Sequence, residues 1–144
     1  MKEMIKKVKE RREGFTMAEL LIVVAIIAVL VAIAIPVFTS QLEKSRESVD
    51  AANIRAAYAE VVAAALTGEV DATSGNTQAY TVTIAADKAT ITATGALVQE
   101  KAGWTGDAPA IGGYTLPGTS ADTNTKWTLT YTVATEAIAV TYAD

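Results

Sequence analysis

The 144-residue chain contains no cysteine and no histidine. It therefore lacks disulfides, a thiol nucleophile, soft metal ligands and the commonest general base. No glycine-rich phosphate-binding loop follows a predicted strand. We expect no catalytic residue, no metal and no cofactor, and hence no enzyme, although composition alone leaves a serine or carboxylate enzyme open. Any exported part of the chain must hold its fold by core packing and sheet pairing alone.

Positive charge is scarce outside the first residues. The formal net charge is −4, and residues 1–14 contain six Lys or Arg against three Glu, so they carry +3 and residues 15–144 carry −7. An acidic exterior argues against a dedicated nucleic-acid surface. Residues 39–144 are long enough to form one globular domain with its own core.

One long apolar run follows the basic leader. In Leu20–Phe38, nineteen residues, the only one that is not plainly apolar is Pro36. As a helix the run spans about 28 Å, close to the hydrocarbon thickness of a bilayer. The positive-inside rule predicts that the leader stays in the cytoplasm and that the C-terminal part lies outside. A simple signal-anchor, or a removable signal cut near residues 32–34 (Ala-Ile-Ala), stays open as an alternative.

A single carboxylate, Glu19, lies at the start of the apolar run. Such a group costs on the order of 3 kcal/mol at the centre of a bilayer and less near its edge, so a functional partner is expected. A cut after Gly14 would remove the leader, keep the apolar run and create an amine on Phe15, four residues from the carboxylate. That amine is a candidate partner for Glu19 in the same chain or in a neighbour. An interfacial carboxylate without a partner is the alternative.

This junction resembles the N-terminal signature of type IV prepilins. The shared features are a basic leader, Gly14 at the cut, Phe15 as first mature residue, Thr16 next, Glu19 fifth, and an apolar helix containing Pro36. The resemblance implies that a membrane prepilin peptidase cleaves between Gly14 and Phe15 and N-methylates Phe15. It also implies that an assembly platform and ATPases extract the subunits from the membrane into a helical homopolymer, with possible minor pilins. Thr16 and Glu19 would serve subunit assembly, Glu19 by neutralising an adjacent subunit's amine.

Two residues depart from the signature. Met17 stands where the family usually has Leu, and Ala28 stands where many pilins have Gly. The absence of cysteine points towards Gram-positive pilins, with streptococcal major pilins closest in character. The implied function is a structural subunit, the major pilin, of an extracellular type IV pilus serving twitching motility, adhesion or DNA uptake. The alternatives are a pseudopilin of a type II secretion or competence system, and a membrane-anchored extracellular binding module.

The apolar helix is predicted to continue well beyond the membrane. Residues 40–66 are good or acceptable helix formers, so we expect one helix from about Phe15 to Leu66, bent near Pro36 and capped by Gly68. A helical stripe of apolar residues predicts its packing face: Leu42, Val49, Ile54, Tyr58, Val61, Val62, Ala65 and Leu66. The charged residues between 43 and 60 fall largely off this stripe and are expected on a solvated face.

The sequence pattern of the C-terminal half predicts β-strands. Alternation of threonine with apolar or aromatic residues marks segments around residues 80–84, 90–92, 127–133 and 138–142, with turns at 87–88 and 134–135. Residues 103–126 are rich in turn formers and predict an irregular loop. The predicted fold class is α+β: one long N-terminal helix packed on a roughly four-stranded antiparallel sheet, the pilin fold. The predicted divisions are a cleaved cytoplasmic leader (1–14), a membrane and filament-core helix (15–38) and an extracellular domain (39–144).

Two further motifs lie in the C-terminal part of the chain. Residues 116–119 (Leu-Pro-Gly-Thr) resemble the start of a sortase motif, but Ser120 stands where Gly is expected and no apolar tail follows, so a turn is favoured. Asp107, Asp122 and Asp144 are candidate calcium ligands by analogy with major pseudopilins. Their spacing matches no EF-type loop.

Overall fold

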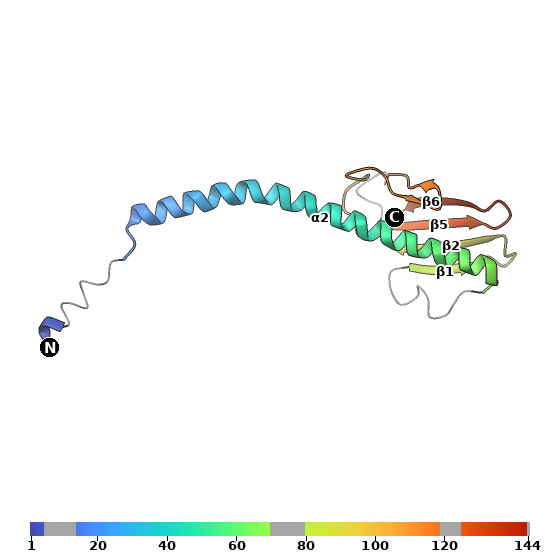
Figure 1. Cartoon of the computed structure of the whole chain (residues 1–144), viewed down its shortest axis with the longest axis horizontal. Helices are drawn as coiled ribbons and strands as arrows, with labels where there is room; N and C mark the ends of the chain where they lie inside the picture. The colour runs from blue at the N-terminus through green and yellow to red at the C-terminus, as the bar shows by residue number, and fades with distance from the viewer. Residues whose placement is uncertain (5–13, 70–79, 119–124, 144) are drawn as a thin grey trace. The chain divides into compact units, whose positions relative to one another are not determined.

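The computed structural model describes residues 1–4, 14–69, 80–118 and 125–143. The chain divides into two compact units, Met1–Thr39 and Ser40–Asp144. Figure 1 shows the long helix α2 and the strands of the second unit.

Helix α2 runs from Met17 to Thr67 without interruption. It begins and ends within two residues of the predicted bounds. Gly68 adopts a positive φ of 74°, and its N–H donates to the carbonyl of Ala64 at 2.8 Å, which confirms the predicted glycine cap. Pro36 lies inside the helix. The bend expected at Pro36 stays a prediction.

Four strands form one antiparallel sheet with the order β1-β2-β5-β6. Their bounds are Tyr80–Ile84 for β1, Thr90–Ala96 for β2, Lys126–Thr132 for β5 and Ala137–Ala143 for β6. The turn after β1 is closed by the Lys88 N–H, which donates to the Ala85 carbonyl, and by the Asp87 side chain, which accepts from the Ala89 N–H. The four predicted strands and both predicted turns are therefore confirmed.

The loop expected to be irregular contains a small hairpin. Strands β3 (Ala110–Ile111) and β4 (Tyr114–Thr115) pair with each other in a separate two-stranded sheet. Gly112 and Gly113 form the two-residue turn, with φ values of 56° and 80°. Two consecutive positive φ angles suit a tight hairpin turn and favour glycine at both positions. The prediction of an irregular segment over 103–126 was therefore wrong for these residues.

The core of the second unit lies between α2 and one face of the four-stranded sheet. The helix contributes Ile54, Ala57, Val61 and Ala64 to this core. The strands and the β3–β4 segment contribute the facing residues, which are Val82, Ile91, Ala93, Ile111, Leu116, Trp127, Leu129, Tyr131 and Val140. Burial of this apolar surface is the main force that holds helix and sheet together. The fold is the predicted one, a long N-terminal helix packed on a four-stranded antiparallel sheet.

The predicted packing stripe on α2 was partly wrong. Five of its eight members contact the core as expected: Ile54 and Val61 are buried, and Tyr58, Val62 and Ala65 are partly buried against it. Leu66 is 84% exposed, and Leu42 and Val49 are exposed as well. The helix also presents Ala57 and Ala64 to the sheet, which the stripe omitted because alanine carries little weight in a pattern of large apolar residues.

Three acidic residues of α2 also lie where charge was not expected. Glu43, Glu47 and Asp50 are 4%, 7% and 0% exposed. They were predicted to belong to a solvated helix face. Their burial corrects that prediction, and the reason is a set of hydrogen bonds to a distant loop, described below.

Candidate functional site

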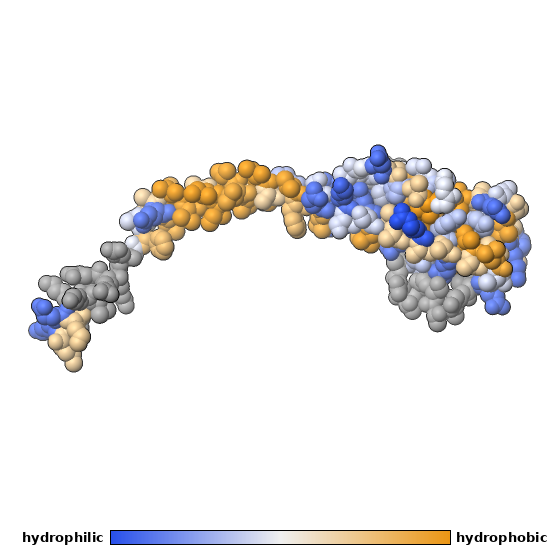
Figure 2. Space-filling model, viewed as in Figure 1, coloured by the Kyte–Doolittle hydropathy of each residue, from blue (hydrophilic) through white to orange (hydrophobic). Residues whose placement is uncertain are grey.

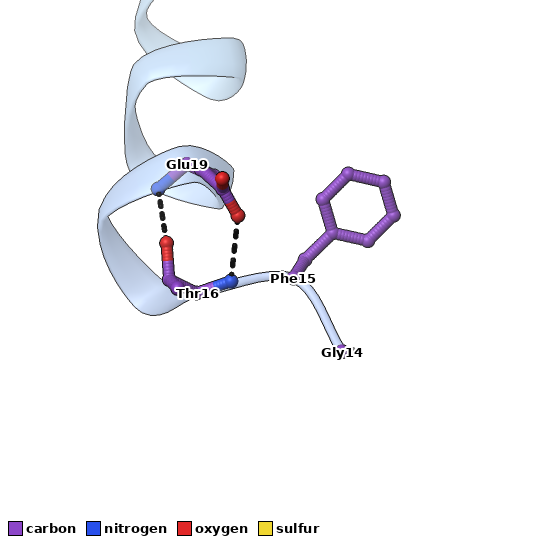
Figure 3. A pocket seen from close by; sticks show the side chains of 4 residues that line it. All are labelled: Gly14, Phe15, Thr16 and Glu19. Atoms are coloured by element: carbon purple, nitrogen blue, oxygen red, sulfur yellow. Dashed lines mark hydrogen bonds between the residues drawn. The ribbon is translucent and has the colours of Figure 1, made fainter. Parts of the chain in front are cut away.

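The residues at the start of α2 form a reciprocal hydrogen-bonded cap, shown in Figure 3. The backbone N–H of Thr16 donates to Glu19 Oε2 at 2.9 Å, and the backbone N–H of Glu19 donates to Thr16 Oγ1 at 3.2 Å. Thr16 is therefore the N-cap and Glu19 the third helical residue of a capping box. The two bonds fix the carboxylate at the mouth of the helix, where the positive end of the helix dipole also favours a negative charge.

The capping box was missed at the level of sequence. The signal was present, because threonine followed three residues later by glutamate just before an apolar run marks a helix start. Glu19 Oε2 is bound to the Thr16 N–H, and within the segments that the structure describes Oε1 has no hydrogen-bond partner. One oxygen of the carboxylate therefore positions the group, while the other stays available to a donor from elsewhere.

Gly14 and Phe15 precede the cap in an extended segment. The Phe15 ring is 87% exposed and points away from Glu19 (Figure 3). A Cβ built on Gly14 would meet nothing within 4 Å. The fold of the chain thus places no steric demand for glycine at position 14.

The apolar part of α2 lies uncovered behind this cap. The large apolar side chains from Leu20 to Phe38 are between 45% and 71% exposed. By length and composition α2 includes a stretch able to cross a membrane, and none of that stretch is buried. Figure 2 shows it as a continuous apolar band. An apolar surface of this extent requires lipid or other apolar helices around it.

A second polar cluster, the carboxylate row Glu43, Glu47 and Asp50, fastens residues 98–105 to α2. The spacing of four and three residues puts all three side chains on one helix face. Asp50 accepts the backbone N–H groups of Val98 and Gln99 at 2.8–3.1 Å. Burial raises the pKa of the Asp50 carboxyl, against the lowering effect of these N–H bonds.

The other two carboxylates hold the next part of the same loop. Glu43 Oε1 accepts the N–H groups of Glu100 and Lys101 at 2.7 Å, and Glu47 accepts the N–H and hydroxyl of Thr105. Arg46 bridges Glu43 at 3.5 Å and Glu100 at 2.6 Å. Because these carboxylate oxygens already accept backbone and side-chain donors, the row serves to hold the loop in place.

The remaining candidate motifs have different outcomes. Leu116, the first residue of the sortase-like motif, is buried in the core, and the Pro117 carbonyl accepts the Trp104 indole N–H at 3.1 Å. This segment is therefore part of the packed fold. Of the three candidate calcium ligands, Asp122 and Asp144 lie outside the described residues. In the part of the chain that is described, no group of three acidic side chains is arranged to hold a metal ion.

Residues 10–35 match a protein family described as the prokaryotic N-terminal methylation motif. The type IV major pilin protein PilA of Myxococcus xanthus (strain DK1622) is 44% identical to this chain over 54 residues, which is 38% of this chain and 24% of that protein. The chain therefore spans about a quarter of the length of that curated relative. No solved structure matches the chain significantly.

The motif and the helix-on-sheet architecture define a protein with an N-terminal methylation signature and an uncovered apolar helix. The N-terminal part of the chain carries this motif, and the similarity of the chain to the Myxococcus pilin is distant and partial. The comparisons give no support to the expected resemblance to Gram-positive, streptococcal pilins.

Proposed function

We propose that this chain is the structural subunit of a type IV pilus, and specifically its major pilin. Before assembly it spans the cytoplasmic membrane once through residues 20–38, with its N-terminus in the cytoplasm. After cleavage between Gly14 and Phe15 and N-methylation of Phe15, it joins a helical filament outside the cell. Such a filament serves twitching motility, adhesion or DNA uptake.

One observation carries the proposal: an uncovered apolar helix begins directly behind a carboxylate held by its own N-cap. In a membrane the helix satisfies its backbone internally and faces lipid. In a filament the same surface packs against the apolar helices of neighbouring subunits. The helix is thus suited to both environments.

Glu19 supplies the polar contact that guides the subunit from the membrane into the filament. An isolated charge inside an apolar helix bundle is costly, so the carboxylate needs a positive partner. The amine that cleavage creates on Phe15 of an adjacent subunit provides one. The capping box supports this role, because Thr16 binds Oε2 and leaves Oε1 without a hydrogen bond among the described residues.

Glycine at position 14 fits recognition by a peptidase. Since a side chain there would meet nothing in the chain itself, any requirement for glycine comes from the enzyme that binds the junction. A peptidase whose active-site cleft encloses an extended segment excludes larger side chains by the shape of that cleft.

The intact Glu19 and the loop-bearing sheet domain favour a major subunit.

Intact mass spectrometry of protein sheared from cell surfaces tests the proposal. We expect a species that begins at Phe15 and carries one added methyl group. A species that begins at Met1 and stays with the membrane would instead indicate a membrane-anchored binding module, and one that begins near Ile35 in the medium would indicate a removable signal. Electron microscopy then separates a long surface pilus from the short envelope-spanning fibre of a pseudopilin.

A further inference from the structure

The outward face of the four-stranded sheet consists almost entirely of threonine and alanine. Side chains alternate across a strand, so the residues that point away from α2 follow from the register. We name this surface the threonine face. Its fourteen residues are Thr81, Thr83, Thr90, Thr92, Thr94, Ala96, Lys126, Thr128, Thr130, Thr132, Ala137, Ala139, Thr141 and Ala143.

The threonines form rows across the sheet. Thr81, Thr94, Thr128 and Thr141 are successive partners in the ladder, so one row crosses all four strands. The hydroxyls of Thr94 and Thr128 lie 3.4 Å apart. Neighbouring side chains in such a row stand about 5 Å apart, which gives a regular surface of hydroxyl and methyl groups.

The face is unusual in its lack of charge. A protein surface with the ordinary share of charged residues carries about four charges in fourteen positions. This face carries one, Lys126, at its corner, although residues 15–144 have a net charge of −7. Charges on an exposed sheet normally prevent sheet-to-sheet association, and their absence here removes that protection.

We propose that the threonine face is the surface through which filaments of this protein associate side by side, each face packing on the same face of a second copy in a neighbouring filament. This interface rests on the proposed pilus function. It is isologous, because identical patches meet about a two-fold axis. Neutral hydroxyl and methyl groups pack without the cost of desolvating a charge. A neutral surface also fits a neutral partner, and the identical face is one.

The size of the face explains why filaments are needed. Four strands about 4.8 Å apart and up to seven residues long present about 400 Å² per copy. A pair buries about 800 Å², which is below the roughly 1,200–2,000 Å² of stable interfaces. A single contact is therefore weak, but many copies along two filaments act together by avidity.

A lysine on the face tests the interface. Thr94 lies on β2, a central strand of the sheet, so Thr94→Lys places a charge inside the face on each side of the contact. We expect filaments of normal length and number but about a tenfold smaller fraction in low-speed pellets. Ala86→Lys, in the exposed turn after β1, adds the same charge away from the face and should bundle as the wild type does. Raising the salt concentration should strengthen wild-type bundling, because salt screens the repulsion between acidic filaments.

A cysteine reports the contact directly, since the natural chain has none. We expect a short bis-maleimide to couple Thr94→Cys subunits into dimers in bundled filaments and to lose this coupling when the filaments are dispersed by dilution. Ala86→Cys should react with a monofunctional maleimide equally well yet form few dimers. Coupling that persists in dispersed filaments would place the contact within one filament and overturn the proposal.

Two further results would also overturn it: Thr94→Lys filaments that bundle like the wild type, or wild-type filaments that stay dispersed at every salt concentration. These failures are distinct from a failure of the pilus function. In that case the wild-type protein forms no filament at all, and both proposals fall together.

Discussion

The Tyr58 ring of α2 packs directly over Gly112 at the turn of the β3–β4 hairpin. A Cβ built on Gly112 would lie 2.6 Å from both Cζ and the hydroxyl oxygen of Tyr58. Gly112 also has a positive φ of 56°. Close approach and backbone conformation therefore both require glycine, and this contact ties the hairpin to the helix.

Gly112→Ala should destabilise the second unit by about 1–3 kcal/mol, because the side chain clashes with Tyr58 and strains a left-handed backbone. Thermal unfolding followed by tryptophan fluorescence measures this loss, since Trp127 is fully buried in the same core. Gly113→Ala is the matched control, with a φ of 80° but nothing within 4 Å of the added Cβ. Equal losses in the two variants would show that the contact with Tyr58 contributes nothing.

Asp50→Ala should loosen the loop at residues 98–105. The change leaves the backbone N–H groups of Val98 and Gln99 without an acceptor, at a cost of about 1–3 kcal/mol for a buried group. Lys44→Ala, at an exposed position of the same helix, should change the free energy of unfolding by less than about 0.5 kcal/mol. A stable Asp50→Ala protein with unchanged proteolysis of the loop would contradict the fastening role of the carboxylate row.

Because the pKa of Asp50 is raised, the contribution of this residue to the unfolding free energy should depend on pH. A carboxyl whose pKa is higher in the folded than in the unfolded state binds more protons when folded, so its contribution to stability falls as pH rises through that range. The difference in unfolding free energy between wild type and Asp50→Ala should therefore be larger in mildly acidic buffer than at neutral pH. A difference that shrinks on acidification would show that the N–H bonds outweigh desolvation at this site.

Local patterns account for most of the fold. Alternating threonine and apolar residues gave the four strands, and an unbroken run of helix formers gave α2. The carboxylate row was missed because its partners lie 48–58 residues away in the chain, and a charged side chain by itself indicates solvent. The β3–β4 hairpin is too short for periodicity to show, although its two adjacent glycines were a usable signal.

At the junction the motif predicted the candidate site, and the structure added the geometry of its residues. The sequence pointed to Glu19 as a charge in need of a partner. It did not reveal that one carboxylate oxygen is already bound to the Thr16 N–H. The Glu19 carboxylate can therefore act as a helix cap and as a charge, and an informative substitution changes one of these roles without the other.

Substitution at Gly14 should affect processing, and the assembly that depends on it, but not the folding of the chain. We expect Gly14→Ala to be cleaved slowly and Gly14→Trp to be left uncleaved, because a side chain at the cut collides with the peptidase, while the chain itself has room for it. Immunoblotting of membranes separates precursor from mature protein. Val98→Trp, at an exposed position of the second unit, controls for the general effect of a bulky residue. Normal maturation of Gly14→Trp would exclude a peptidase that reads this position.

Substitution of Glu19 can separate the cap from the charge. Glutamine retains a side-chain oxygen that can accept the Thr16 N–H, so Glu19→Gln should keep the helix start, which an N-cap stabilises by about 1 kcal/mol. It removes the negative charge, and with it the proposed ion pair to the amine of Phe15 in an adjacent subunit. We therefore expect Glu19→Gln and Glu19→Ala to be cleaved nearly normally and both to lose most surface filaments, as measured by electron microscopy and by the yield of sheared protein. Thr16→Ala breaks the cap but leaves the charge, so it should reduce assembly less than either Glu19 variant. Wild-type piliation in Glu19→Gln together with loss in Glu19→Ala would mean that capping, and not charge neutralisation, is what assembly requires of this residue.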